Sequence, residues 1–338
     1  YNILFILILF KIIMIIIFMS RPGLANLGNT CFMNSLLQVL IDIDEFNIIF
    51  SGNRKDNLLK SFNNLYDDSR CKTGVIIPKK FHNHLQQYAI KCKNKILIGY
   101  SQNDCSELLI FLFDVFHDDL KRNVIMNVHG KSENTTDDLA IKCYNFKKKS
   151  LEGEYSEIYD VFYFIQVDQI ININNIVTSE LFTWNCQLSL YLPEKNRNNY
   201  SISILDCIKK NFESISYKNE KNEDSEKKYY VWNLPSILVI VLQRFSNYNK
   251  NNILVEFPLN NLDLSEYVIG YNKNSYVYDL MGICNHSGNI HGGHYTAYSK
   301  TRNNWYLYND SGTSLVKDTS KLISNNAYCL FYRKKNII

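Results

Sequence analysis

The sequence predicts an α+β protein in which helices come first along the chain and antiparallel strands come last. Residues 23–122 carry apolar side chains at the three- and four-residue spacing of amphipathic helices. Residues 231–335 instead hold a series of short runs rich in β-branched and aromatic residues. Helices first and antiparallel strands last are typical of the α+β class, and we expect a cleft where the helical and sheet halves meet.

Two helices are predicted in the first region. The run 32–40 has apolar residues at 33, 36, 37 and 40, and the run 104–120 repeats the pattern. Strands are expected in the last region over 237–245, 276–286, 294–300, 305–310 and 327–334. Four residues, 301–304, join the third and fourth of these, which is typical of a hairpin. Residues 123–230 are mixed, with polar stretches around two strand-like runs, 158–167 and 186–193.

Composition excludes some classes of protein. The chain has 338 residues, 46% of them hydrophobic, which is enough for one large core or two smaller ones. Its 37 basic and 33 acidic residues give a net charge of only +4, and no block of Lys and Arg is interleaved with aromatics, so no nucleic acid partner is expected. The nine cysteines include no C-x-x-C pair, which is typical of reduced thiols in the cytoplasm or nucleus.

Residues 1–19 form a separate apolar segment. Residues 1–18 are apolar except for Asn2 and Lys11, and their length is at the lower limit for a membrane-spanning helix. Lys11 at the centre would cost roughly 3 kcal/mol on insertion. Met19 offers an alternative translation start. Two interpretations therefore stay open: an artefactual or disordered upstream tail, or a membrane anchor.

Cys31 stands at the predicted start of the first helix. Asn29 or Thr30 is expected to cap that helix, and Gly28 permits a tight turn into it. Backbone N–H groups at a helix N-terminus stabilise a thiolate, which an ordinary cysteine, with a pKa of about 8.5, forms only in part at neutral pH. Cys31 is therefore a candidate nucleophile, although a lone cysteine before a helix is more often a buried structural thiol.

A base for this thiol is expected from a histidine on a rigid element. His294 opens the strand 294–300 after two glycines, and Asn309 lies near the end of 305–310. If the hairpin closes with a two- or four-residue turn, both side chains lie on one face, opposed or one pair apart. The Asn309 amide oxygen is then expected to accept the Nδ1–H of His294. Asp310 alternates to the other face and ranks second.

These candidates stand in segments that resemble the ubiquitin-specific proteases. Residues 23–40 (GLANLGNTCFMNSLLQVL) are similar to the cysteine box of that family, and residues 293–298 (GHYTAY) with 305–310 (WYLYND) are similar to its histidine box. The resemblance extends to 102–120, 234–245, 285–288 and 327–334, and so covers nearly all of the chain from residue 23 to residue 335. It implies a papain-like cysteine peptidase fold with a helical thumb, a β-sheet palm and β fingers.

The resemblance implies a role for each matching residue. Cys31 matches the nucleophile, His294 the base and Asn309 the third member of the triad. Asn26 matches the side chain that helps form the oxyanion hole, where one donor is worth roughly 3 kcal/mol of barrier.

Substrate contacts are implied in the same way at Asp104 and Glu107. These match acidic residues that hold the basic C-terminal tail of ubiquitin, and their i, i+3 spacing puts both on one helical face. A helix cap plus a solvated carboxylate is the alternative interpretation, and both could hold.

One departure from the family concerns metal. Many members carry two C-x-x-C pairs in the fingers that bind structural zinc. Residues 167–170 (VDQI) and 217–221 (YKNEK) stand roughly where those pairs would fall, and neither contains cysteine. Four thiolate ligands are therefore lacking, and we expect no zinc and no other cofactor.

The resemblance predicts a catalytic domain over residues 20–335, with a thumb at about 23–122, fingers at about 150–230 and a palm at about 231–335. The expected activity is that of a thiol-dependent deubiquitinase, a monomeric catalytic domain acting on ubiquitin and ubiquitinated proteins. A non-catalytic ubiquitin-binding scaffold and a protease for a ubiquitin-like modifier are the alternatives. We expect a cytoplasmic or nuclear location, with membrane association if residues 3–18 are an anchor.

Overall fold

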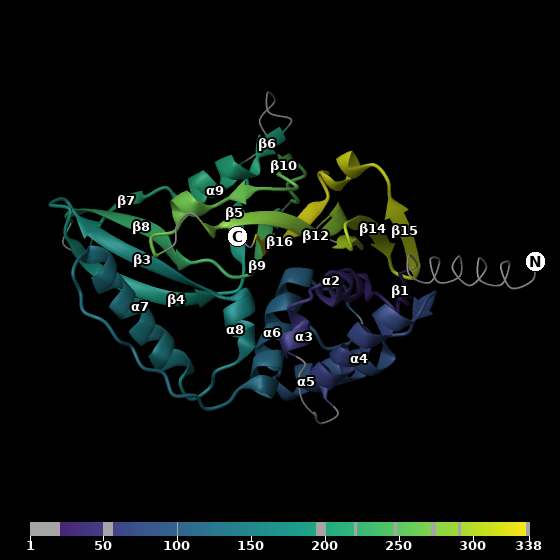
Figure 1. Ribbon diagram of the computed structural model, residues 1–338. Helices are drawn as coiled ribbons and strands as arrows, with labels where there is room; N and C mark the ends of the chain where they lie inside the picture. Colours follow the sequence, from purple (N-terminus) through teal and green to yellow (C-terminus); the bar gives the residue numbers. More distant parts are fainter. Residues whose placement is uncertain are drawn as a thin grey trace, which may run out of the picture. The chain divides into compact units, whose positions relative to one another are not determined.

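Helices and mainly antiparallel sheets make up the structure, as the sequence predicts for an α+β protein, although β5 joins β9 in parallel. The computed structural model describes residues 21–49, 57–99, 101–193, 201–219, 222–246, 249–271, 275–289 and 292–335. The described residues form two compact units (Figure 1). The first comprises residues 21–111, 284–288 and 292–319, and the second comprises residues 112–283, 289 and 320–335.

The first unit packs helices against a sheet built from the late part of the chain. Its helices are α2 (Cys31–Ile41), α3 (Phe46–Ile49), α4 (Leu58–Cys71), α5 (Lys79–Lys91) and the first seven residues of α6 (Cys105–Leu120). Its sheet has the order β15-β14-β13-β12, made of β15 (Gly312–Val316), β14 (Asn304–Asn309), β13 (Gly292–Thr301) and residues 284–288 of β12 (Val277–Asn289). Two short strands, β1 (Gly23–Leu24) and β2 (Val75–Ile76), pair in parallel. The predicted helices 32–40 and 104–120 are confirmed.

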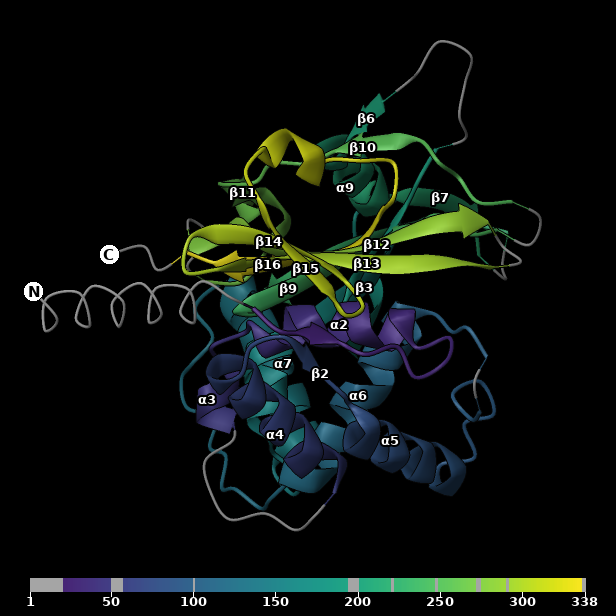
Figure 2. The same ribbon diagram turned by 90° about the vertical axis from the view of Figure 1, so that its right-hand side faces the viewer.

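Helix α2 is the centre of this unit, because all eleven of its residues are buried. Figure 2 shows the helix lying between the strands β13 and β14 on one side and α4 on the other. A helix that is buried on every side must satisfy its polar side chains internally. Gln38 does so by donating to the carbonyl oxygen of Pro22 at 3.0 Å, and Ser35 by donating to that of Phe32 at 3.0 Å.

The predicted hairpin is confirmed as β13 and β14. Thr301 pairs with Asn304, so only Arg302 and Asn303 form the turn, and both have positive φ angles, of 49° and 68°. A two-residue turn of this kind matches the right-handed twist of the strands and fixes the register. Ala297 lies opposite Tyr308 in that register.

The second unit holds two sheets. One runs β12-β16-β9-β5, with residues 277–283 of β12, β16 (Ala327–Lys334), β9 (Ile237–Gln243) and β5 (Leu188–Tyr191). The other runs β4-β3-β8-β7, with β4 (Val177–Asn185), β3 (Phe164–Asn172), β8 (Asp224–Asn233) and β7 (Ile215–Lys218). The smaller elements are α9 (Ile204–Phe212), the paired strands β6 (Ser201–Ser203) and β10 (Leu254–Glu256), β11 (Leu262–Asp263), and 3₁₀ turns at Ser265–Tyr267 and Thr319–Leu322.

Helix α7 (Thr135–Leu151) covers one face of the four-stranded sheet (Figure 1), and the sequence did not reveal it. Its N-terminus is capped by Asn134, whose side chain accepts from the backbone N–H groups of the second and third residues that follow, at 2.9 and 3.0 Å. Its apolar stripe is sparse, which hid the helical period. The core that it forms with the sheet contains Ala140, Cys143, Ile165, Val167 and Trp232.

The run 158–167, expected as a strand, was wrong in its first half. Residues Glu157–Phe162 form the short helix α8, and β3 begins only at Phe164. Two acidic residues, Glu157 and Asp160, lie in the first turn of α8, where they favour a helix N-terminus. Ile158 and Phe162 are buried at i, i+4 spacing, a pairing that a strand does not make.

The apolar segment 1–19 lies outside the described residues. Within the part of the chain that is described, no helix combines the length and apolar character needed to cross a bilayer. Residues 167–170 lie inside β3 and residues 217–218 inside β7, whereas 220 and 221 are not described. Among the described residues, no group of three or more His, Cys, Asp or Glu side chains is placed to hold a metal ion.

We predict that the stability of the four-stranded sheet does not depend on zinc. The sheet packs against α7 around a core of apolar side chains, and this packing replaces the stabilisation that a thiolate-bound zinc ion would give. Elemental analysis of the purified protein should find no stoichiometric zinc, and a strong chelator should leave the melting temperature unchanged. One zinc ion per chain, or a fall in melting temperature on chelation, would contradict this.

Candidate active site

Cys31 is the first residue of α2, and a tight loop brings the chain to it. Gly28 and Asn29 have positive φ angles of 103° and 54°, so the loop uses the left-handed turn expected of the glycine. Thr30 occupies the N-cap position but does not cap the helix with its side chain, contrary to expectation. Its hydroxyl oxygen accepts instead from the backbone N–H of Leu27 at 2.9 Å, which closes the loop on itself.

The Cys31 thiol has a raised pKa, which differs from the thiolate-stabilising environment expected from the sequence. Burial raises the pKa most, and the negative charge of Asp310 raises it further. The backbone N–H groups of Tyr295, Phe32 and Cys31 lower it, as predicted for a helix N-terminus, but they do not outweigh burial. The resting sulfur is therefore a neutral thiol at neutral pH and needs a base to remove its proton.

His294 and Asn309 come together on one face of the β13–β14 hairpin. Ala297 lies opposite Tyr308, so continuing the register puts residue 296 opposite Asn309, and His294 lies two residues along on the same face. His294 Nε2 lies 2.6 Å from Asn309 Oδ1. An amide oxygen can only accept, so Nε2 carries the proton and Nδ1 is left as the basic nitrogen. The sequence assigned the opposite nitrogen to Asn309, because register alone does not say which edge of the ring faces the strand.

The thiol lies against the strand that carries this histidine. The backbone N–H of Tyr295, the residue directly after His294, acts on the Cys31 sulfur. Tyr295 is buried and His294 is half-buried. Helix α2 and strand β13 therefore place the Cys31 sulfur beside Tyr295, the residue that directly follows His294.

Asn26 organises the loop before the nucleophile. Its Oδ1 accepts from the backbone N–H groups of Gly28 and Thr30, at 2.9 and 3.2 Å. Its Nδ2 donates to Asp310 Oδ2 at 2.9 Å. The nitrogen carries two hydrogens, and Asp310 needs only one of them, so the second can serve an oxyanion.

Asp310 has a role that the sequence did not suggest. It does not bond to His294. Its two carboxylate oxygens accept from two amides, Asn26 Nδ2 at 2.9 Å and Asn34 Nδ2 at 2.8 Å. Asn34 lies in helix α2, which begins with Cys31, and is 2% exposed. Asp310 therefore ties the hairpin end to both the loop and the helix around Cys31.

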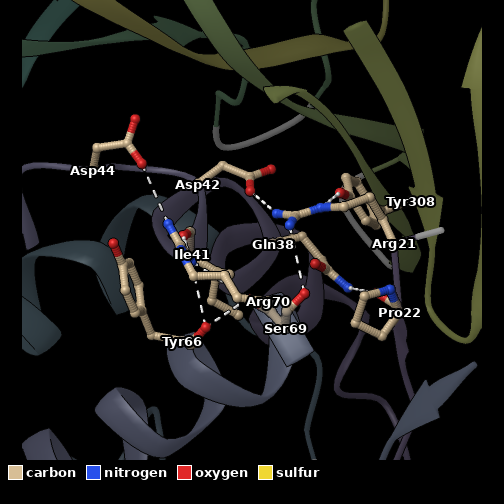
Figure 3. A network of polar contacts seen from close by, with 10 residues as sticks. All are labelled: Arg21, Pro22, Gln38, Ile41, Asp42, Asp44, Tyr66, Ser69, Arg70 and Tyr308. Atoms are coloured by element: carbon tan, nitrogen blue, oxygen red, sulfur yellow. Dashed lines mark hydrogen bonds and ion pairs between the residues drawn. The ribbon is translucent and has the colours of Figure 1, made fainter. Parts of the chain in front are cut away.

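A buried ion pair holds the far end of α2 (Figure 3). Arg21 Nη2 bonds to Asp42 Oδ1, and the two side chains are 10% and 1% exposed. Arg21 Nε also donates to the Tyr308 hydroxyl at 3.3 Å, on β14. Asp42 stands at the C-terminal end of α2, where a carboxylate is unfavourable, and the guanidinium offsets that charge. The ion pair thus links helix α2, which begins with Cys31, to the hairpin that carries His294.

Asp104 and Glu107 lie together at the start of α6. Asp104 Oδ1 accepts from the Ser106 backbone N–H at 2.6 Å, so the expected cap is present. Glu107 is exposed as a whole, but its carboxyl is partly desolvated by the groups around it. This partial desolvation raises the pKa of Glu107, and the nearby charge of Asp104 raises it further. Two adjacent carboxylates, one of them with a raised pKa, are suited to binding a cation.

Comparison with known proteins supplies the family. The family model described as ubiquitin carboxyl-terminal hydrolase matches residues 22–332. The chain belongs to the ubiquitin carboxyl-terminal hydrolase family. Its resemblance to the ubiquitin-specific proteases in sequence is thereby confirmed.

Several members of this hydrolase family are similar along most of the chain. Bovine ubiquitin carboxyl-terminal hydrolase 2 is 33% identical over 341 residues, which cover 92% of this chain and 54% of the bovine protein. Rat ubiquitin carboxyl-terminal hydrolase 21 is 30% identical over 368 residues, covering 93% and 61%. The chicken ubiquitin carboxyl-terminal hydrolase 2 is 31% identical over 340 residues, covering 92% of both. The chain spans about half the length of the bovine relative that it matches.

Solved structures confirm the fold of the chain. A SAGA DUB module that contains Ubp8 and is bound to monoubiquitin matches with a TM-score of 0.69 and 23% identity, over 94% of this chain and 70% of that chain. A yeast SAGA DUB module matches with a TM-score of 0.69 and 22% identity, over 95% and 70%. The predicted papain-like fold of the ubiquitin-specific proteases is therefore correct.

We predict that the Arg21–Asp42 ion pair contributes strongly to the stability of the protein. Asp42→Ala leaves a buried guanidinium without its charge partner and should lower the free energy of unfolding by about 3 kcal/mol. Asp44→Ala is the matched control. Asp44 lies two residues away, is 68% exposed and pairs with Arg70 at 3.3 Å, so its loss should cost less than about 1 kcal/mol. Equal losses in urea unfolding would contradict the role of the buried pair.

Proposed function

We propose that this chain is a thiol-dependent deubiquitinase that cleaves the bond after the C-terminal glycine of ubiquitin. The observation that carries the proposal is the hydrogen bond of 2.6 Å between His294 Nε2 and Asn309 Oδ1, on a strand that lies against the Cys31 thiol. A nucleophile, a base and a group that orients the base are the parts that acyl transfer needs. Membership of the ubiquitin carboxyl-terminal hydrolase family supports ubiquitin as the acyl donor.

The reaction begins with proton transfer from the Cys31 thiol to His294 Nδ1. The thiolate attacks the carbonyl carbon of the terminal glycine, and the carbonyl oxygen becomes an oxyanion. The Asn26 amide and the Cys31 backbone N–H are the donors for that charge. The C–N bond then breaks, His294 returns its proton to the leaving amine, and a thioester between Cys31 and ubiquitin remains.

The second half of the reaction hydrolyses the thioester. His294 Nδ1 takes a proton from water, the hydroxide adds to the thioester carbonyl, and the C–S bond breaks. The released thiolate recovers the proton from His294. Asn309 keeps the Nε2–H in place through both halves, so that Nδ1 always faces the reacting groups.

The form of the substrate follows from exposure and charge. Cys31 is only 3% exposed, so a chain end without side chains, such as Gly-Gly, is best able to reach the sulfur. Asp104 and Glu107 supply negative charge for the basic tail that precedes those glycines. We propose residues 23–122 as the thumb, 150–230 as the fingers and 231–335 as the palm of this enzyme.

We predict that Cys31→Ala abolishes turnover of a ubiquitin–fluorophore substrate while ubiquitin still binds, because only the nucleophile is removed. His294→Ala should lower kcat by about 1,000-fold, since proton transfer is lost. Asn309→Ala should lower kcat by only about tenfold, since His294 is then less well oriented but can still transfer a proton. Equal losses in the His294 and Asn309 variants would assign the orienting role to another residue.

The alternatives are tested with a ubiquitin probe that carries a C-terminal electrophile. Covalent capture at Cys31, identified by mass spectrometry, supports the enzyme. Binding without capture would instead support a non-catalytic scaffold. Faster capture by the same electrophile on a ubiquitin-like modifier would assign the enzyme to that modifier.

We predict that ubiquitin binds more weakly as the pH falls, through Glu107. The pKa of this carboxyl is raised, so it loses its negative charge at a higher pH than an ordinary glutamate, and the attraction for a cationic tail is lost with it. KM should therefore be higher at pH 5.5 than at pH 7.5. Glu107→Gln should have a high KM at both pH values, whereas Asp67→Asn, at an exposed carboxylate of α4, should behave as wild type. An unchanged pH dependence in Glu107→Gln would contradict this assignment.

A further inference from the structure

The side chain of Gln102 holds both backbone polar groups of one residue, Gly293. Gln102 Nε2 donates to the Gly293 carbonyl oxygen at 2.9 Å, and the Gly293 N–H donates to Gln102 Oε1 at 3.0 Å. A neighbouring antiparallel strand makes the same pair of bonds to a residue opposite it. The amide of Gln102 therefore acts as a one-residue strand partner at the beginning of β13.

Gly293 directly precedes His294, and side-chain packing cannot anchor it. A Cβ at position 293 would lie 2.2 Å from the Ser287 carbonyl oxygen and 2.3 Å from His286 Nε2, so only glycine fits. At Gly292 a Cβ would lie 3.2 Å from Gln102 Oε1. Two glycines in sequence have high backbone freedom unless hydrogen bonds restrict them. Gln102 supplies two such hydrogen bonds to Gly293.

The segment that carries Gln102 is itself fixed. Two residues further on, Asp104 accepts from the Ser106 N–H at 2.6 Å and so locks the segment to the start of α6. Its backbone carbonyl also accepts from the Leu108 N–H at 3.1 Å. Gln102 thus connects a rigid helix end to the backbone of the residue before the base.

We propose that Gln102 is a positioning residue for His294. By fixing the Gly293 backbone, it keeps the imidazole in register with Asn309 and holds Nδ1 toward the Cys31 thiol. Its loss leaves the substrate-binding carboxylates in place but lowers the fraction of molecules in which the base is aligned. The inference depends on the proposed deubiquitinase activity only for the choice of substrate.

The first test compares kcat and KM for a ubiquitin–fluorophore substrate. Gln102→Met keeps the length of the side chain and removes both bonds, and Gln102→Glu keeps an acceptor for the Gly293 N–H and loses the donor. Asn103→Ala is the matched control, because Asn103 is the next residue and its side chain donates to Ser101 within the same segment. We expect kcat to fall about tenfold in Gln102→Met and less in Gln102→Glu, with KM unchanged in both. Asn103→Ala should match wild type.

A second test does not use ubiquitin. Alkylation of Cys31 by iodoacetamide at neutral pH, followed by mass spectrometry of the peptide that contains residue 31, reports whether a base is aligned with the thiol. The alkylation rate should fall in Gln102→Met by the same factor as kcat. If Gln102→Met does not fold, the same comparison is made with Gln102→Glu. Slower alkylation in a protein that does not turn over ubiquitin would support the positioning role and reject the deubiquitinase. Rates of turnover and alkylation equal to those of Asn103→Ala would overturn the proposal.

Discussion

The structure of the candidate site depends on the complete burial of helix α2. A helix with no exposed face can take only one orientation in the core. Any rotation about its axis would move polar side chains such as Asn34 and Gln38 away from their hydrogen-bond partners. Its first residue is Cys31, so fixing the helix fixes the sulfur. The contact with β13 then determines which strand lies beside that sulfur. Burial of this one element therefore places the candidate nucleophile, and the hairpin register places His294 and Asn309 relative to each other.

The same burial has a chemical cost, since it raises the pKa of the thiol that it positions. Asp310 raises the pKa further, yet its carboxylate also holds Asn26 and Asn34. Burial thus holds the sulfur in one position, and as a consequence the resting sulfur is a neutral thiol rather than a thiolate. Such a site needs a well-oriented base, and the bonds of His294 to Asn309 and of Gly293 to Gln102 are both means of orientation. A neutral resting thiol is also less open to adventitious oxidation than a thiolate.

The sequence predicted those parts of the fold in which the pattern has one structural meaning. The apolar period of 32–40, the buried run at 237–243 and the hairpin spacing around residues 301–304 each led to the observed element. Helix α7 was missed because its apolar stripe is narrow and its capping residue, Asn134, is a type common in loops. Helix α8 was taken for a strand because six residues are too few to display a helical period.

The candidate site was likewise predictable only where the pattern of residues has one structural meaning. Cys31, His294 and Asn309 could be found from their types and order, and hairpin register brought the last two together. The identity of the His294 ring nitrogen that faces Asn309 could not be predicted, since it depends on rotation of the side chain. Gln102 lies in a segment that resembles the family, but nothing in the sequence connected it with the glycines before His294. Only the folded structure shows that its side chain binds the Gly293 backbone.

The most direct test of the account is the pH dependence of Cys31 alkylation by iodoacetamide in wild type and in His294→Ala. If the imidazole serves the thiol, the wild-type rate at pH 7 should exceed the variant rate by about tenfold or more. The two rates should converge at high pH, where the thiolate forms without a base. Equal rates at every pH would mean that the two groups do not meet, and would contradict the account.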